Sequence, residues 1–124
     1  MDSDILVFFD RMPQALSLYE TVARKICGNY TDVRIKVSKT QISFSNKYNF
    51  AFVSLPTRNI KNRPKVCIIL TFGLVRKIDH PRIEISVEPY PNRWTHHVII
   101  QNADEVDGQI MEWIDEAYHF SLTK

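Results

Sequence analysis

The chain has 124 residues, of which 44% are hydrophobic and 24% are charged. This length fits one domain, and this composition excludes a disordered or fibrous protein. No run approaches the ~20 apolar residues of a membrane-spanning helix, and the acidic start Met1-Asp2-Ser3-Asp4 is unlike a secretory signal. We therefore expect a single domain over residues 1–124, with no membrane partner and a cytoplasmic location.

The charges are strongly segregated along the chain. The formal net charge is only +2, but residues 33–78 contain ten basic and no acidic residues. The flanking segments 1–32 and 79–124 carry net charges of −2 and −6. This segregation indicates an anionic partner, such as an anionic small molecule or nucleic acid, for the middle of the chain. The alternative is internal pairing, in which the basic strands face the acidic ends of the same fold.

Helices are predicted at the N-terminal end. Residues 3–10 form a short helix with Ile5, Leu6 and Phe9 on one side. Pro13 suits the first turn of a second helix over residues 13–27, which Gly28-Asn29 ends. Its apolar positions recur at helical spacing: Leu16, Tyr19, Val22, Ala23 and Ile26.

Strands are predicted from residue 33 to residue 101. Apolar and polar residues alternate over 33–38, 41–45 and 83–88, which is typical of half-buried strands. The segment 48–55 is rich in aromatic residues, and the almost continuously apolar segment 66–72 predicts a central strand buried on both faces. The last strand covers 95–101, and the alternation places Ile83, Ile85 and Val87 in the core.

A final helix follows. Asn102 is its expected cap, with Glu105 as the capping-box partner. The apolar stripe consists of Val106, Ile110, Trp113, Ile114 and Ala117, and Gly108 within the helix would weaken it by ~1 kcal/mol. The predicted fold is an α+β domain: a mainly antiparallel meander of about six strands, with the N-terminal and C-terminal helices packed on one face.

The stretch from Pro89 to Ile100 has the most unusual chemistry in the chain. Because strand side chains alternate, Trp94 and His96 are expected on one face and His97 on the other, so the adjacent histidines cannot both bind one metal. One interpretation makes Trp94 a core residue and one histidine structural. The other places Arg93 and one histidine in an anion or ligand site.

Several sequence blocks resemble a family of small bacterial and archaeal domains catalogued as a domain of unknown function, in which some longer relatives are labelled predicted transport proteins. The blocks are KTQISF (39–44), FAFVSLP (50–56), Pro81–Ile83, EPYPNRWTHH (88–97) and EAY (116–118). The resemblance implies a compact α+β domain and no established catalytic residue. The motif positions that it makes candidates for ligand binding are Lys39, Thr40, Gln41, Arg82, Glu88, Arg93, His96 and His97, to which we add Trp94.

The sequence favours a non-catalytic binding module for an anionic ligand or nucleic acid. Candidate residues for contact with the anion are Arg34, Lys36, Lys47, Arg58, Lys61, Arg63 and Lys65, with Tyr48, Tyr90 and Trp94 as stacking surfaces. No phosphate-binding loop or nucleophile elbow is present, so we expect no cofactor. Two alternatives stay open: a small-molecule or hydrolytic site using Lys39, Gln41, Arg93 and His96, and a protein-interaction module that uses a sheet edge. Cys27 and Cys67 show no CxxC pattern and predict buried free thiols.

Overall fold

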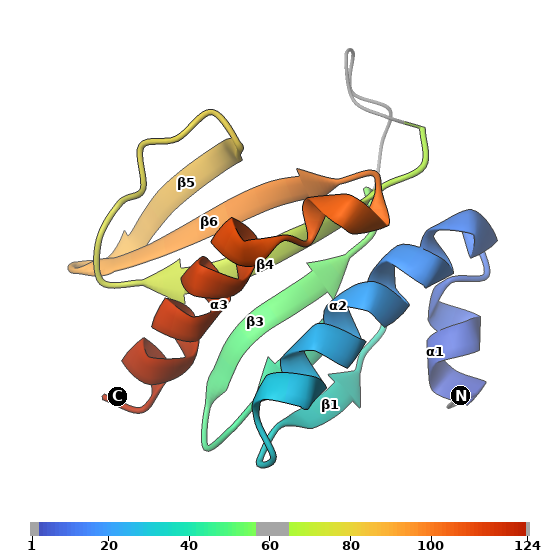
Figure 1. Cartoon of the computed structure of the whole chain (residues 1–124), viewed down its shortest axis with the longest axis horizontal. Helices are drawn as coiled ribbons and strands as arrows, with labels where there is room; N and C mark the ends of the chain where they lie inside the picture. Colours follow the sequence, from blue (N-terminus) through green and yellow to red (C-terminus); the bar gives the residue numbers. More distant parts are fainter. Residues whose placement is uncertain (1–2, 57–64, 124) are drawn as a thin grey trace.

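The protein is an α+β domain built on one six-stranded antiparallel sheet (Figure 1). The computed structural model describes residues 3–56 and 65–123. The strands, in chain order, are β1 Arg34–Val37, β2 Ile42–Ser45, β3 Asn49–Ser54, β4 Ile68–Leu74, β5 Ile83–Tyr90 and β6 Arg93–Ile100. The predicted fold class and strand number are thus confirmed.

The strand order is β1-β2-β3-β4-β6-β5, so the predicted simple meander is wrong at one place. β6 lies between β4 and β5, because the chain leaves β4, passes to the sheet edge and returns through the β5–β6 hairpin. β6, which ends in the apolar run Val98-Ile99-Ile100, therefore occupies an interior position, and β5 forms the edge. The EPYPNRWTHH block forms the tip of this hairpin and the start of β6.

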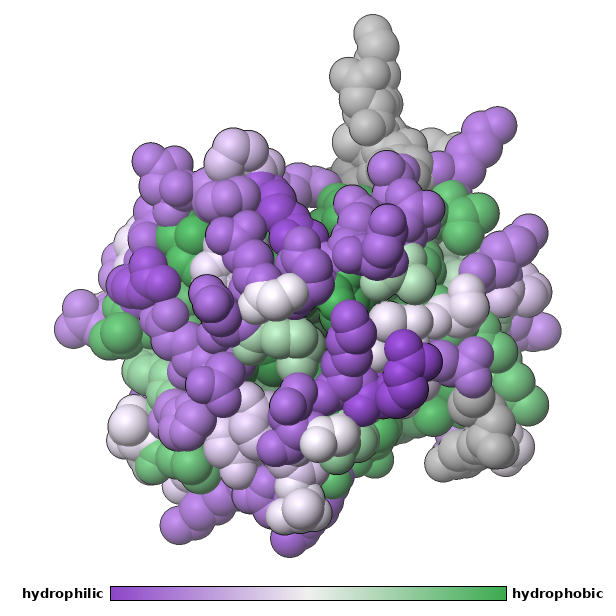
Figure 2. Space-filling view, viewed as in Figure 1, coloured by the Kyte–Doolittle hydropathy of each residue, from purple (hydrophilic) through white to green (hydrophobic). Residues whose placement is uncertain are grey.

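Two long helices cover one face of the sheet (Figure 1). They are α2, Leu16–Asn29, and α3, Gly108–Ser121, and the shorter α1, Ser3–Phe8, contacts β1. Alternate strand residues point toward these helices and form one buried core with them, including Phe44, Leu70 and Ile114. The helix-covered side is largely hydrophilic in its outer layer (Figure 2), as expected for amphipathic helices.

The opposite face of the sheet, which we call the helix-free face, follows from the strand register. One row runs across all six strands, Lys36–Ser43–Phe52–Thr71–His97–Ile85. The neighbouring row on the core side is Ile35–Phe44–Ala51–Phe72–His96–Ser86. Since paired residues point to the same face, Trp94 and His96 lie on the core side and His97 on the helix-free side, as the alternation predicted.

β5 does not follow the predicted alternation. Its register shifts between Ile83 and Ile85 and again between Val87 and Tyr90. Each shift inserts an extra residue and reverses which side chains face the core. Ile85 and Val87, expected in the core, therefore lie on the helix-free face and are each 49% exposed, whereas Ser86 pairs with the buried His96.

The helix ends also differ from the prediction. The helix predicted over residues 13–27 splits into a 3-10 turn, Pro13–Ala15, and α2, which extends through Gly28 to Asn29. The helix continues because Tyr30 N–H still donates to Ile26 O, 3.2 Å away. Cys27 is exposed on this last turn rather than buried, while Cys67 is buried as expected.

The capping box at Asn102 and Glu105 is present, but it caps a separate 3-10 turn, Ala103–Glu105 (η2). The α3 helix starts later: Asp107 is its N-cap and accepts a bond from Ile110 N–H. Gly108 is therefore the first helical residue, where glycine costs less than in the helix interior, and the predicted penalty does not apply. The predicted stripe from Val106 to Ala117 is buried throughout.

Among residues 3–56 and 65–123, no helix is both long and apolar enough to cross a membrane.

Candidate binding cleft

A cleft of about 410 Å³ lies at the end of the sheet where β3 and β6 begin and β4 ends. The sheet contributes Phe52, Thr71, Gly73 and Thr95, which all lie on the helix-free face. The other lining residues are Tyr48 of the β2–β3 turn, Asn49 and Phe50 at the start of β3, Phe72 of β4, Pro89, Tyr90, Arg93 and Trp94 of the β5–β6 hairpin, and Ala117, Phe120 and Ser121 of α3. All three predicted stacking residues therefore line this one cleft.

Buried polar contacts hold the Tyr48 side of the cleft. Asn46 is buried, and its Nδ2 donates to Ser121 Oγ at 3.0 Å, which ties the β2–β3 turn to α3. The Asn46 Oδ1 accepts a bond from Tyr48 N–H at 2.9 Å. The Tyr48 side chain is 38% exposed, so its backbone is fixed while its ring stays accessible.

The β5–β6 hairpin forms the opposite side. Tyr90 pairs with Arg93 across a turn in which Asn92 adopts φ 61°, the left-handed conformation that asparagine tolerates. Glu88, a predicted ligand residue, accepts a bond from Asn92 N–H at 3.1 Å and so stabilises the turn. Tyr90 is 68% exposed and Arg93 is exposed, so both present their side chains to solvent.

Cations surround the aromatic side chains of the cleft. Lys47 Nζ lies 5.8 Å from the Tyr48 ring centroid, and Lys77 Nζ lies 5.6 Å from the Trp94 ring centroid. The Arg93 side chain makes no hydrogen bond or ion pair with any residue that the structure describes. The cleft thus combines flat apolar surfaces with positive charge, a pairing suited to an aromatic anion.

Gly73 keeps the floor of the cleft open. A Cβ placed on Gly73 would meet only the Trp94 carbonyl oxygen, at 4.0 Å, so no close packing requires glycine there. Sequence reasoning missed Gly73 as a site residue, together with Phe52 and Phe120. A glycine that interrupts an apolar strand is a recognised sign of close approach by another molecule, and it was the available signal.

His96 is a structural residue. It is fully buried, its ring stacks on Phe72 at 5.4 Å between centroids, and its Nε2 accepts a bond from Ile78 N–H at 2.9 Å. Burial lowers the pKa of His96, Arg76 acts in the same direction, and Glu116 opposes them. The neutral ring thus serves as a hydrogen-bond acceptor inside the core, as one interpretation of the histidine pair expected.

His97 lies on the helix-free face and is half-buried. Its Nδ1 is 2.9 Å from Thr71 Oγ1, so the cross-strand partner fixes the ring orientation. Of the two histidines, only His97 is on the face to which Arg93 and Tyr90 belong.

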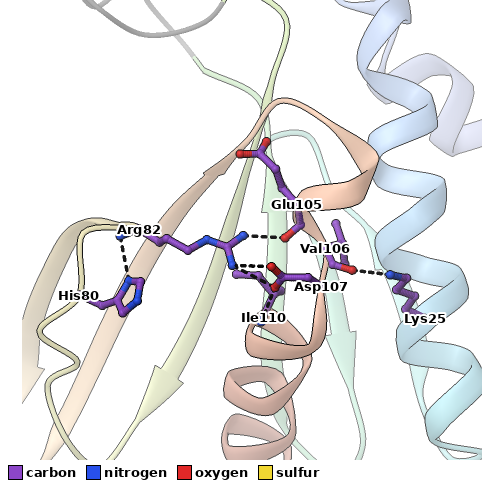
Figure 3. A network of polar contacts seen from close by, with 7 residues as sticks. All are labelled: Lys25, His80, Arg82, Glu105, Val106, Asp107 and Ile110. Atoms are coloured by element: carbon purple, nitrogen blue, oxygen red, sulfur yellow. Dashed lines mark hydrogen bonds and ion pairs between the residues drawn. The ribbon is translucent and has the colours of Figure 1, made fainter.

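Arg82 belongs to a structural network at the other end of the sheet (Figure 3). Its guanidinium donates to both Asp107 carboxylate oxygens, at 2.9 and 3.1 Å, and to Glu105 O at 2.6 Å. Burial raises the pKa of Asp107, but the bonds from Arg82 and Ile110 N–H outweigh it and lower the pKa overall. Arg82 therefore links the start of β5 to the N-terminus of α3.

Lys39, Thr40 and Gln41 lie in or beside the β1–β2 turn, far from the cleft. This turn is at the opposite end of β2 from Tyr48, and β3 and β4 separate β2 from β6. Lys39 lines a different cleft of about 570 Å³, together with Arg11, Asp4 and Asp10. The set Lys39, Gln41, Arg93 and His96 does not meet in one cleft.

The basic segment is mostly not neutralised by carboxylates. Within the described part of the chain, Arg76 pairs with Glu116 at 2.9 Å, whereas no ion pair involves Arg34, Lys36, Lys39, Lys47, Lys65 or Lys77. Arg58, Lys61 and Arg63 lie outside the described residues. Nor do the described residues contain a group of three or more His, Cys, Asp or Glu side chains that could hold a metal ion.

The chain matches the family model described as Domain of unknown function (DUF5655) over residues 7–121. No curated protein and no solved structure matches the chain.

Proposed function

We propose that this chain, which belongs to the DUF5655 family, is a non-catalytic module that binds a planar anionic ligand in the cleft at the end of the sheet. The observation that carries the proposal is the juxtaposition of Arg93 with the aromatic lining of the cleft. The guanidinium of Arg93 offers a planar set of donors that suits phosphate or carboxylate groups. Tyr48, Tyr90 and Trp94 offer surfaces on which an aromatic ring stacks.

The dimensions of the cleft support a small ligand. A volume of about 410 Å³ falls within the ~300–1,000 Å³ typical of ligand pockets. The lining combines aromatic residues and the basic Arg93 with uncharged polar residues, and no carboxylate is among the lining residues. A nucleotide, which joins an aromatic base to a phosphate, satisfies both parts of this lining.

Two alternatives have less support. A hydrolytic site would need Lys39, Gln41, Arg93 and His96 within reach of one substrate, and the buried His96 already serves as the acceptor for Ile78 N–H. A protein-interaction module would need an open sheet edge, but β5 carries two register shifts and Pro89, and β1 carries Arg34 and Lys36. These features discourage pairing with another strand.

The test is calorimetric titration of the protein with adenosine monophosphate, with adenosine and inorganic phosphate as partial ligands. We expect a Kd of about 1 mM or tighter, equivalent to at least ~4 kcal/mol, and weaker binding of either partial ligand. Arg93→Ala should weaken binding of adenosine monophosphate about tenfold, since a charge-assisted hydrogen bond contributes ~1.5–3 kcal/mol.

The matched control is Arg24→Ala, which removes an exposed arginine from α2 on the helix-covered side. It should leave the affinity unchanged. A second variant, Gly73→Val, should fill the cleft and abolish binding while far-UV circular dichroism shows an intact fold. Equal affinity for the wild type and Arg93→Ala, or no binding to the wild type, would overturn the proposal.

A further inference from the structure

We propose that the helix-free face of the sheet binds single-stranded nucleic acid, with one nucleotide in the cleft and the strand crossing the sheet from β5 toward β1. This inference rests on the proposed function, because Phe52 and Thr71 belong both to the cleft and to the row that crosses all six strands. It extends the site for one nucleotide into a continuous binding surface along this row, which we call the track.

The row of side chains has the length of a short oligonucleotide. It runs from Ile85 on β5 to Lys36 on β1, across six adjacent strands. With about 4.8 Å between strands, the row spans roughly 24 Å. About seven nucleotides stacked about 3.4 Å apart would cover this length, and a more extended strand would cover it with fewer nucleotides.

The charges on this face favour a polyanion. Arg34 and Lys36 point to the helix-free face of β1 and are exposed, and neither makes an ion pair within the described residues. No Asp or Glu occupies a paired strand position in the described sheet, since Glu84 and Glu88 fall at the irregular positions of β5.

Four acidic side chains lie on the other side of the molecule. Asp107, Glu112, Asp115 and Glu116 belong to α3 or its cap, and the helix covers the core face of the sheet. The positive field on the helix-free face is therefore not cancelled locally, and cations on one face attract phosphates.

The centre of the row supplies contacts for bases rather than phosphates. Phe52 and His97 are half-buried rings on adjacent sides of Thr71, and Tyr90 stands exposed beside Arg93. Aromatic and histidine rings on an open sheet stack the bases of single strands, whose faces are accessible only when unpaired. A duplex hides these faces, so we expect the sheet to bind single-stranded nucleic acid in preference to a duplex.

The test is fluorescence anisotropy with labelled oligothymidylates of two and eight nucleotides and an eight-base-pair duplex. We expect the octamer to bind at least tenfold more tightly than the dinucleotide, with affinity falling as salt increases. The double variant Arg34→Ala/Lys36→Ala should weaken octamer binding about tenfold and leave binding of adenosine monophosphate unchanged. Phe52→Leu should weaken both, because Phe52 belongs to the cleft as well.

Lys39→Ala is the matched control, since Lys39 is exposed in the adjacent turn but outside the row. It should leave octamer binding within twofold of the wild type. If adenosine monophosphate binds but the octamer binds no more tightly than the dinucleotide, the single-strand site on the helix-free face is contradicted, whereas the nucleotide site in the cleft is not. Absence of adenosine monophosphate binding would instead contradict the proposed function. Tighter binding of the duplex than of the octamer would also overturn the track.

Discussion

His96 and His97 show how strongly the environment of a residue determines its role. The two residues are adjacent in β6 and chemically identical, yet one is buried against Phe72 and the other lies on the helix-free face. The sequence predicts that they face opposite sides, because strand side chains alternate. It does not predict which one meets solvent, since that depends on which face α2 and α3 cover.

The lowered pKa of His96 predicts a pH dependence of stability. The unfolded chain takes up a proton near the ordinary pKa of ~6.5, whereas burial keeps the folded ring neutral to lower pH. Below pH ~6.5 the unfolded state therefore binds more protons than the folded state. The contribution of the neutral His96 ring to the free energy of unfolding is complete above pH ~6.5 and decreases as the pH falls from there toward the folded pKa. The slope reaches at most about 1.4 kcal/mol per pH unit.

His96→Phe removes this contribution. Above pH ~6.5 the variant should be destabilised by ~1–3 kcal/mol, because Ile78 N–H loses its acceptor, and this difference from the wild type should shrink as the pH falls. Its free energy of unfolding should change less than that of the wild type between about pH 8 and pH 5. Urea denaturation followed by circular dichroism measures both quantities, and parallel pH curves for the two proteins would refute this assignment.

At the scale of elements, the sequence predicts which segments are helices and strands better than it predicts where they end or pair. The apolar spacing of α2 and α3 and the apolar positions Ile42 and Phe44 of β2 directly reflect burial. The register shifts of β5 leave no comparable pattern, because Ile85 and Val87 remain apolar although they face solvent. The insertion of β6 beside β4 is equally hidden, since it arises from pairing between distant segments.

The same limit applies to the binding cleft. Tyr48, Tyr90 and Trp94 are predicted from residue type alone as stacking surfaces, and all three line it. Their convergence, and the exclusion of Lys39 and Gln41, depend on which end of each strand is involved. Arg82 is the opposite case. Its place in a motif block made it a candidate for ligand binding, but its side chain instead makes structural contacts with the N-terminus of α3.

The position of each glycine in its helix gives a prediction at this scale. Gly28 lies inside α2 with no positive φ, and a Cβ there would meet no atom within 4 Å. Gly28→Ala should therefore increase the free energy of unfolding by about 0.5–1 kcal/mol. Gly108→Ala serves as the comparison, because Gly108 is the first residue of α3 and should gain less. Thermal or urea unfolding decides the order, and a larger gain at Gly108 would contradict these helix boundaries.

At the scale of the whole molecule, the fold converts a segregation of charge along the chain into a segregation in space. The basic segment supplies β1 to β4, and the acidic C-terminal segment supplies β5, β6, η2 and α3, of which α3 packs on the opposite face of the sheet. Apart from Arg76, the described basic residues of that segment are left without carboxylate partners. Internal pairing, the alternative explanation of the charge pattern, thus accounts for only a small part of it.

The most direct measurement of this account is amide chemical-shift mapping of ¹⁵N-labelled protein titrated with an eight-nucleotide oligothymidylate. We predict the largest shifts at Phe52, Thr71, Gly73, Arg93 and His97, on the cleft and the adjacent helix-free face, and small shifts on the exposed side of α2 and α3. Shifts concentrated on the helices, or none at all at low salt, would contradict it.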